Sequence, residues 1–164
     1  MKSLITSEAI QSCIYQVRGQ KIILDVDLAR FYGVSPKALN QAVKRNPKKF
    51  PDDFTFQLQN QEVTFLRSHF VTANISSKSR SLPYVFTEHG ALMAANVLRS
   101  PKANQMSVLI IRAFIGLRDE NKQQEKIVNH ILEKLSQHDE EIAGLSLFLN
   151  EILKMQKKEK KFLN

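Results

Sequence analysis

A heptad repeat runs through the C-terminal third of the chain. From Ile110 onward, alternating steps of four and three residues reach thirteen positions, of which ten are apolar: Ile110, Phe114, Leu117, Asn121, Gln124, Val128, Ile131, Leu135, His138, Ile142, Leu145, Leu149 and Ile152. This spacing predicts a long helix with one apolar seam, the pattern of a coiled coil sustained for about five heptads. Ser100-Pro101, a capping residue followed by proline, predicts where the helix begins. We expect residues 121–164 to be a coiled-coil oligomerisation helix with a basic tail.

This helix is too long to bury its seam by folding back. Residues 121–152 would extend roughly 48 Å at about 1.5 Å per residue, farther than a small domain can cover. An apolar seam left in water forfeits most of its hydrophobic stabilisation, so the seam predicts an intermolecular partner. We expect a homodimer or higher homo-oligomer through residues 121–152. The predicted contacts are Val128, Ile131, Leu135, Ile142, Leu145, Leu149 and Ile152.

Four residues leave the details of this helix open. Asn121, Gln124 and His138 are polar although they occupy seam positions. They either fix the register of the paired helices or mark weak points where the helix leaves the globular part. Gly144 lowers helix stability by about 1 kcal/mol relative to alanine, so a bend or an antiparallel return near it is also open.

The first 120 residues have a different sequence pattern, in which short periodic segments alternate with residues typical of turns. Gly19 separates two apolar runs and predicts either a β-hairpin or two short strands about a turn. Residues 54–59 alternate apolar and polar side chains, which predicts a half-buried strand with Thr55 on its polar face. Asn60 is expected to cap the next helix, and Thr87 to cap another in which Leu92 is available for packing.

The stretch "DVDLARFYGVSPKALNQAVKR", residues 25–45, predicts two helices joined by a short turn. Gly33 ends the first helix and supplies the positive φ that a tight corner needs. Ser35 is a good N-cap, and Pro36 suits the first position of the second helix, which should run to about Arg45. Small and apolar residues can fill the wedge between the helices: Leu28, Ala29, Val34, Leu39 and Val43. These are the requirements of a helix-turn-helix.

The second of these helices carries basic and amide side chains together. Between residues 36 and 50 there are five Lys or Arg and no acid. Lys and Arg contact DNA phosphates, and Asn or Gln can pair with an adenine edge in the major groove. The predicted DNA-binding residues are Ser35, Lys37, Asn40, Gln41, Lys44, Arg45, Lys48 and Lys49, with Lys78 and Arg80 as a second phosphate contact in a Ser-rich loop. The alternatives are a basic helix face that merely meets water and a plain mobile loop.

The positive charge favours a polyanionic partner, although solubility alone can also explain a moderate positive balance. The net charge is +8, and residues 1–120 hold most of the excess, with 16 Lys and Arg against 9 Asp and Glu. The start, "MKSLITSEAI", lacks the apolar run of a secretory signal, and no stretch has the length of a membrane span. Cys13 is the single cysteine, so an internal disulfide is excluded. We expect a cytoplasmic protein, in the bacterial cytoplasm or nucleoid, with no membrane association.

Two motifs raise the possibility of an enzyme, and the surroundings of both argue against it. Pro51-Asp52 could belong to a restriction-type nuclease motif, but its distant partner, Glu120-Asn121-Lys122, falls in a predicted helix rather than a strand. Glu88-His89 could be a metal or acid-base pair, but the first turn of a helix favours glutamate electrostatically, and no second cluster lies nearby. We expect no enzymatic activity, metal, cofactor or small-molecule substrate. A protein-interaction module using the coiled coil, with DNA binding secondary, is the main alternative.

Four ordered blocks resemble a known family. They are "VRGQKIILDVDLARFYGV", "LNQAVKRNPKKFPDDFTFQL", "LPYVFTEHGALMAANVL" and "IIRAFIGLRD", and the resemblance covers roughly residues 10–118. This part of the chain is similar to the KilA-N-like group of phage and bacterial DNA-binding domains, and within it to the ORF-six-N domain, named for the N-terminus of an open reading frame six product. The segment between Phe70 and Leu82 departs from the pattern, because it has no glycine where the family has a glycine-rich turn.

The resemblance implies a function on double-stranded DNA. It implies a DNA-binding domain over residues 1–120, with residues 39–46 and the adjoining basic loop in the binding face, and a phage- or prophage-type transcriptional regulator or antirepressor. The expectation that this protein acts as a dimer comes from the heptad seam of residues 121–152, which lies outside the resemblance. The expected fold class is α+β, a small globular domain with a helix-turn-helix-like unit and short antiparallel strands, followed by the long C-terminal coiled-coil helix.

Overall fold

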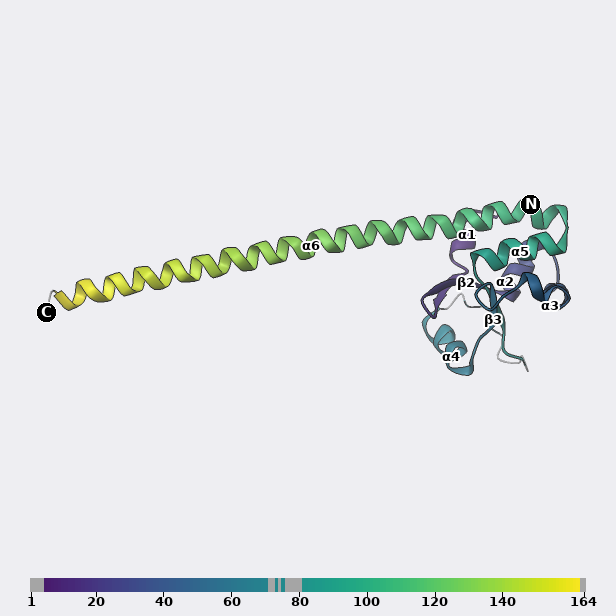
Figure 1. Cartoon of the computed structure of the whole chain (residues 1–164), viewed down its shortest axis with the longest axis horizontal. Helices are drawn as coiled ribbons and strands as arrows, with labels where there is room; N and C mark the ends of the chain where they lie inside the picture. Colours follow the sequence, from purple (N-terminus) through teal and green to yellow (C-terminus); the bar gives the residue numbers. More distant parts are fainter. Residues whose placement is uncertain (1–4, 71–72, 74, 76–80, 163–164) are drawn as a thin grey trace. The chain divides into compact units, whose positions relative to one another are not determined.

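The computed structural model describes residues 5–70, 73, 75 and 81–162 and divides into two compact units, Met1–Arg118 and Asp119–Asn164. The first unit is an α+β fold with a four-stranded sheet, as expected (Figure 1). Its elements are α1 (Ser7–Gln11), β1 (Ile14–Val17), β2 (Gln20–Leu24), α2 (Asp25–Tyr32), α3 (Pro36–Lys44), the 3-10 turn η1 (Pro47–Lys49), β3 (Thr55–Gln57), α4 (Asn60–His69), β4 (Tyr84–Phe86), α5 (Glu88–Leu98) and the first part of α6 (Pro101–Phe162).

The sheet has the strand order β1-β2-β4-β3, and every neighbouring pair is antiparallel. The predicted hairpin is confirmed: Arg18 and Gly19 connect β1 to β2 with φ values of 53° and 73°. Two positive φ values in a two-residue loop match the twist of the strands it joins. The central strands β2 and β4 are apolar on both faces, because helices cover the sheet on both sides.

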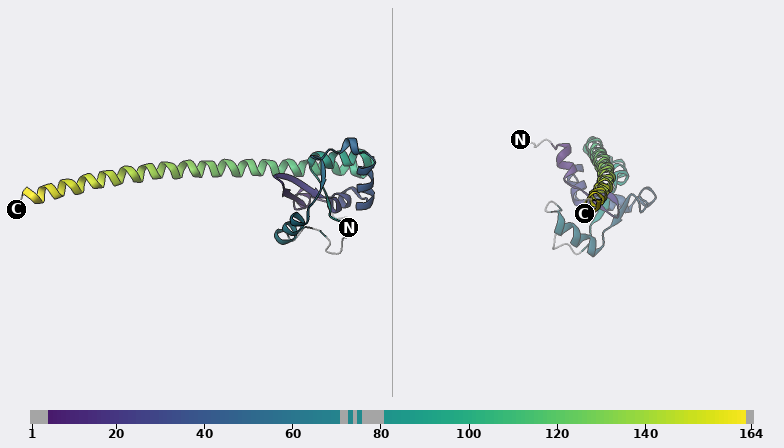
Figure 2. Two further views of the ribbon diagram at one scale, coloured as in Figure 1. Left: turned by 60° about the horizontal axis from the view of Figure 1, so that its bottom comes forward. Right: turned by 90° about the vertical axis from the view of Figure 1, so that its left-hand side faces the viewer.

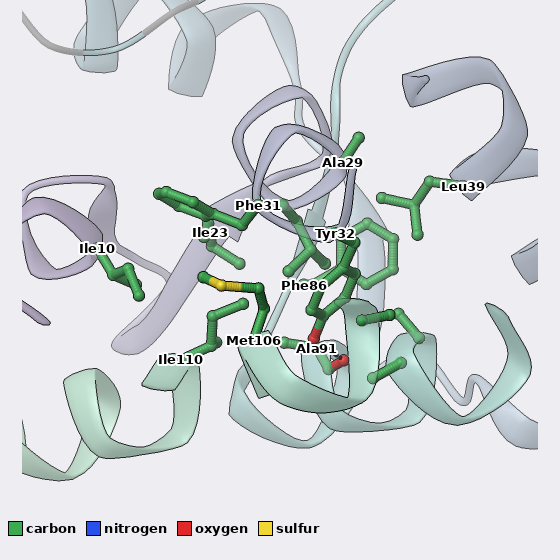
Figure 3. Close-up of a cluster of buried hydrophobic side chains, with 14 of the residues drawn as sticks. Ile10, Ile23, Ala29, Phe31, Tyr32, Leu39, Phe86, Ala91, Met106 and Ile110 are labelled. Carbon is green, nitrogen blue, oxygen red and sulfur yellow. Dashed lines mark hydrogen bonds between the residues drawn. The ribbon is translucent and has the colours of Figure 1, made fainter. Parts of the chain in front are cut away.

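One face of the sheet is covered by α1, α2, α5 and the first part of α6. Phe86 of β4 is fully buried there, beside Met106 and Ile110 of α6. Figure 3 shows side chains from these separate elements converging on one cluster, with the Tyr32 hydroxyl directed at Ala91. That hydroxyl donates a 2.6 Å hydrogen bond to the Ala91 carbonyl and fastens α2 to α5.

The other face of the sheet is covered by α4, which Figure 2 shows on the side away from α5. Val63 and Leu66 of α4 pack there on a separate apolar cluster. The predicted Asn60 cap is wrong by one residue, because Gln59 is the N-cap and forms a capping box with Glu62. The backbone N–H of Gln59 donates a 2.7 Å hydrogen bond to the Glu62 carboxylate. Arg18 also bonds Glu62 and holds the pKa of that carboxyl below its usual range.

Two burial expectations for this unit are wrong. Thr55 is buried, not on a solvent face, and its hydroxyl donates a 2.8 Å bond to the Val85 carbonyl of the neighbouring strand. That bond satisfies the polar group, so alternation alone misassigns the residue. In α5, Leu92 stays 46% exposed. The helix instead buries small residues, because Gly90 approaches the Phe54 backbone too closely to leave space for a Cβ.

The second unit consists of residues 119–164, with α6 continuing through it to Phe162 (Figure 1). Gly144 lies inside the helix, so the antiparallel return left open by the sequence does not occur there. Most of the seam is exposed, from 51% at Ile131 to 62% at Leu145. Across the described ranges, no helix combines the length and the apolar character needed to cross a membrane.

Candidate nucleic-acid interface

The turn between α2 and α3 has the structure that its sequence predicts. Gly33 ends α2 with φ 71° and ψ 31°, a left-handed conformation that glycine adopts without strain. The Gly33 and Val34 amides donate to the last carbonyls of α2, at Arg30 and Ala29. Ser35 then caps α3, accepting a 3.1 Å hydrogen bond from the Ala38 amide. The two helices, their boundaries and the cap are therefore confirmed.

Helix α3 packs against the core of the first unit through one apolar side. Leu39 is fully buried, in the same cluster as the fully buried Ala29 of α2. Val34 and Val43 are partly buried against that cluster. Because these residues fix the rotation of the helix, the side chains on the opposite face must point to solvent.

The exposed face of α3 carries the predicted polar residues. Lys37, Gln41 and Lys44 are exposed and follow one another at steps of four and three, so they share one side of the helix. Asn40 differs from the prediction, since it is half-buried and its amide donates a 2.7 Å bond to Asp25. The Lys44 amine lies 5.9 Å from the centre of the Tyr84 ring.

These side chains line one wall of a groove of about 1020 Å³, here called the α3 groove. Helix α4 forms another wall through Asn60, Val63 and Arg67, and Gln57 and Tyr84 come from strands β3 and β4. Among the described residues that line it, the cations are Lys37, Lys44 and Arg67, and the acid is Asp25. Asp25 is 8% exposed, so its charge is withdrawn from the surface. The groove is thus a concave, mainly basic surface.

The other predicted contacts are placed differently. Ser35 acts as the α3 cap, and its hydroxyl is occupied by that role. Arg45, Lys48 and Lys49 are exposed, but none of them lines the α3 groove. Lys49 donates a 3.2 Å bond to the Asn96 side chain of α5. Lys78 and Arg80 lie outside the described residues.

Sequence reasoning missed the far wall of the groove. Arg67 and Asn60 belong to α4, which follows α3 only after a turn and a strand. Neither residue stands in a motif, and their place beside α3 depends on how α4 covers the sheet. Tyr84 reaches the groove from the start of β4, within the block "LPYVFTEHGALMAANVL" that carries part of the family resemblance.

The candidate acid-base pair at Glu88-His89 is engaged in structural contacts. The Glu88 carboxylate forms an ion pair with Arg118 of α6. The His89 ring stacks on Phe54, with 5.5 Å between ring centres. Within the described part of the chain, no group of three or more His, Cys, Asp or Glu side chains is arranged to hold a metal ion.

Comparison with known proteins places this unit in a family. The family model described as the ORF6N domain matches residues 12–97. The match includes all four strands, the α2–α3 pair and every described residue that lines the α3 groove. No curated protein and no solved structure matches the chain. The matched residues are more than half of the 164-residue sequence, and the chain belongs to the ORF6N domain family.

Proposed function

We propose that the first unit binds double-stranded DNA through the exposed face of α3. The observation that carries this proposal is the arrangement of Lys37, Gln41 and Lys44 on one side of a helix anchored by buried Leu39. A single helix fits the major groove of B-DNA, where Gln can pair bidentately with adenine and Lys can reach the phosphates. Gln41 is the candidate base reader, since Asn40 already donates to Asp25.

The α3 groove would add to the phosphate contacts. Arg67 on the α4 wall and Lys44 on the α3 wall face the same space. A duplex with α3 in its major groove brings the flanking phosphates to both sides of the helix. Arg45, Lys48 and Lys49 continue the positive charge beyond the end of α3, which suits a phosphate strand that runs along the helix.

Within this proposal the chain is a phage- or prophage-type transcriptional regulator or antirepressor, not an enzyme. Membership of the ORF6N domain family supports the phage-type role. DNA recognition by an exposed helix requires no metal, cofactor or small-molecule substrate, and the partner is the duplex itself. Such a protein would act in the bacterial cytoplasm or nucleoid, where its DNA is found.

The second unit is proposed to join two copies of the chain. Its seam residues are exposed although a heptad pattern spaces them for burial. Two tethered DNA-binding units rebind at high effective concentration, so pairing would tighten binding to a duplex with two sites. The same seam favours the second candidate function, a protein-interaction module in which the helix recruits another protein and DNA binding is secondary.

The test is binding of the full chain to a pool of labelled random duplexes at low salt, measured by fluorescence anisotropy. The double variant Lys37→Glu/Lys44→Glu should lose at least tenfold in affinity and show a shallower salt dependence. The matched control is Lys126→Glu/Lys154→Glu, which changes the net charge equally but lies on α6, at exposed positions outside the seam. No binding by the wild-type chain would overturn the proposal. Equal losses of affinity in both double variants would show that DNA binding depends on net charge and not on α3.

A further inference from the structure

The apolar surface of the second unit is wider than a two-position seam. With Val128, Leu135, Ile142 and Leu149 at heptad position a, Met155 lies at position g near the end of the helix, and four further apolar residues flank the seam at positions e and g between residues 127 and 153. They are Ile127, Leu132, Phe148 and Leu153, and they are 52%, 57%, 60% and 53% exposed. Flanking positions of a coiled coil usually carry charges that choose the partner and its direction. Here positions e and g are apolar around residues 127–132 and again around residues 148–153. A partner helix must therefore present apolar side chains opposite these two stretches.

A second copy of this chain matches those places when it runs parallel and in register. In that arrangement a g residue of one helix faces the e residue five positions later on the other. Ile127 then faces Leu132 of the second copy, and Phe148 faces Leu153. Lys134 faces Asp139, an attractive pair, and both residues are exposed. Glu120 facing Glu125 is an unfavourable pair, placed at the start of the second unit.

The polar seam residues also favour the parallel arrangement. In register, Asn121, Gln124 and His138 each meet their own copy, so their polar groups can hydrogen-bond across the seam. An antiparallel pair instead brings a positions against d positions. In its registers of greatest overlap His138 then meets Leu135 or Ile142, and a polar group would be buried against an apolar one.

We propose that α6 pairs with a second copy of itself as a parallel, in-register coiled coil over residues 120–155. This deepens the self-association in the proposed function and rests on it. Chain connectivity then attaches both DNA-binding units to the same end of the coiled coil. The paired chain is therefore built to engage two neighbouring sites on one duplex, whereas an antiparallel pair would attach its units to opposite ends.

Disulfide trapping tests the direction of pairing without DNA. The native cysteine is removed with Cys13→Ala, and Gln124→Cys is added at seam position d of the full chain. In a glutathione redox buffer, the parallel register should convert most of the protein to a covalent dimer. In an antiparallel pair the two introduced thiols would lie roughly 37 Å apart, at about 1.5 Å per residue, and could not join. Lys126→Cys, at an outward position of the same helix, is the matched control and should stay reduced.

Charge reversal gives an independent readout. Lys134→Asp and Asp139→Lys should each weaken association roughly threefold to tenfold in sedimentation equilibrium, because each creates like-charge pairs across the seam. The double variant Lys134→Asp/Asp139→Lys should recover the wild-type affinity. In the antiparallel register Lys134 faces Glu141, so the double variant would stay weak and the proposal would be overturned. A dimer in which the Gln124→Cys variant forms no disulfide overturns the parallel register alone, whereas a monomeric mass at micromolar concentration overturns self-association itself.

Discussion

The side-chain amide of Asn40 donates a 2.7 Å hydrogen bond to the carboxylate of Asp25, the first residue of α2. Asp25 also accepts from the Val26 amide at 2.9 Å, so its charge is held in place by two donors. This pair connects the start of α2 to the middle of α3. It also divides the amide side chains of α3 into one that holds the fold and one, Gln41, that faces solvent.

We expect Asn40→Ala and Gln41→Ala to have opposite profiles. Asn40→Ala should lower the free energy of unfolding by about 1.5–3 kcal/mol, because a hydrogen bond to a carboxylate is lost. Gln41→Ala should leave unfolding unchanged and weaken binding to a preferred duplex by about 1–3 kcal/mol, the scale of one bidentate base contact. Urea unfolding and anisotropy on the same samples measure both. A Gln41→Ala variant that binds normally would assign base reading to another residue.

Gly90 and Gly144 form a matched pair for alanine substitution. A Cβ at Gly90 would overlap the carbonyl of Phe54, whereas a Cβ at Gly144 has no neighbour within 4 Å. Gly90→Ala should therefore destabilise the first unit by about 1–3 kcal/mol or more, as overpacking does. Gly144→Ala should stabilise α6 by about 1 kcal/mol through helix propensity. Thermal unfolding followed by circular dichroism measures both changes, and a harmless Gly90→Ala would mean that α5 can move away from the Phe54 backbone.

The family match ends before the core is complete. Met106, Ile110 and Phe114 of α6 are buried against the sheet, beyond the matched residues 12–97. Removing even one large core side chain costs about 2–5 kcal/mol. A chain ending at Leu98 should therefore lose cooperative unfolding, while a chain ending at Arg118 should keep it. Cooperative melting of the shorter chain would show that α6 is dispensable for the fold.

Asp27 makes stability depend on pH. It is 1% exposed, its Oδ1 lies 3.0 Å from the Arg30 guanidinium, and its Oδ2 has no hydrogen-bond partner among the described residues. Burial raises the pKa of this carboxyl above its ordinary value, a shift that Arg30 opposes. Because the folded pKa lies above the unfolded one, the folded state takes up a proton first as the pH falls, and stability rises.

The difference in unfolding free energy between wild type and Asp27→Asn isolates this contribution. It should grow in favour of wild type as the pH falls from 7 toward about 4, near the ordinary aspartate pKa. Asparagine cannot take up the proton, so the variant lacks this gain. Urea unfolding at several pH values measures the difference, and a difference independent of pH would show that Asp27 titrates alike in both states.

The sequence predicted those parts of the site whose structure is determined locally. Gly33, Ser35 and Pro36 act through their own backbone geometry and hydrogen bonds, so the turn and the start of α3 could be read directly. The face of α3 followed from the spacing of Leu39 and Val43. Asn40 was misjudged because its partner, Asp25, lies fifteen residues earlier, at the start of another helix.

The far wall of the groove and two burial assignments could not be read from the sequence. Arg67 reaches the groove because α4 covers one face of the sheet, and no spacing along the chain encodes that. Thr55 is buried because the Val85 carbonyl accepts its hydroxyl, a contact set by strand order. Leu92 is exposed because Gly90 brings α5 so near the Phe54 backbone that small residues fill the contact.

The strand order has a consequence for how the chain is made. Strand β2 lies between β1 and β4, and its Ile23 pairs with Phe86 of β4. During synthesis the hairpin of β1 and β2 emerges early, but its central ladder and its covering helices are encoded far downstream. Contacts so distant along the chain form slowly and late. On the ribosome, Ile23 of β2, which shares a cluster with Met106 and Ile110 of α6, therefore lacks part of its cover until α6 emerges. The nascent protein is most exposed to aggregation during this interval.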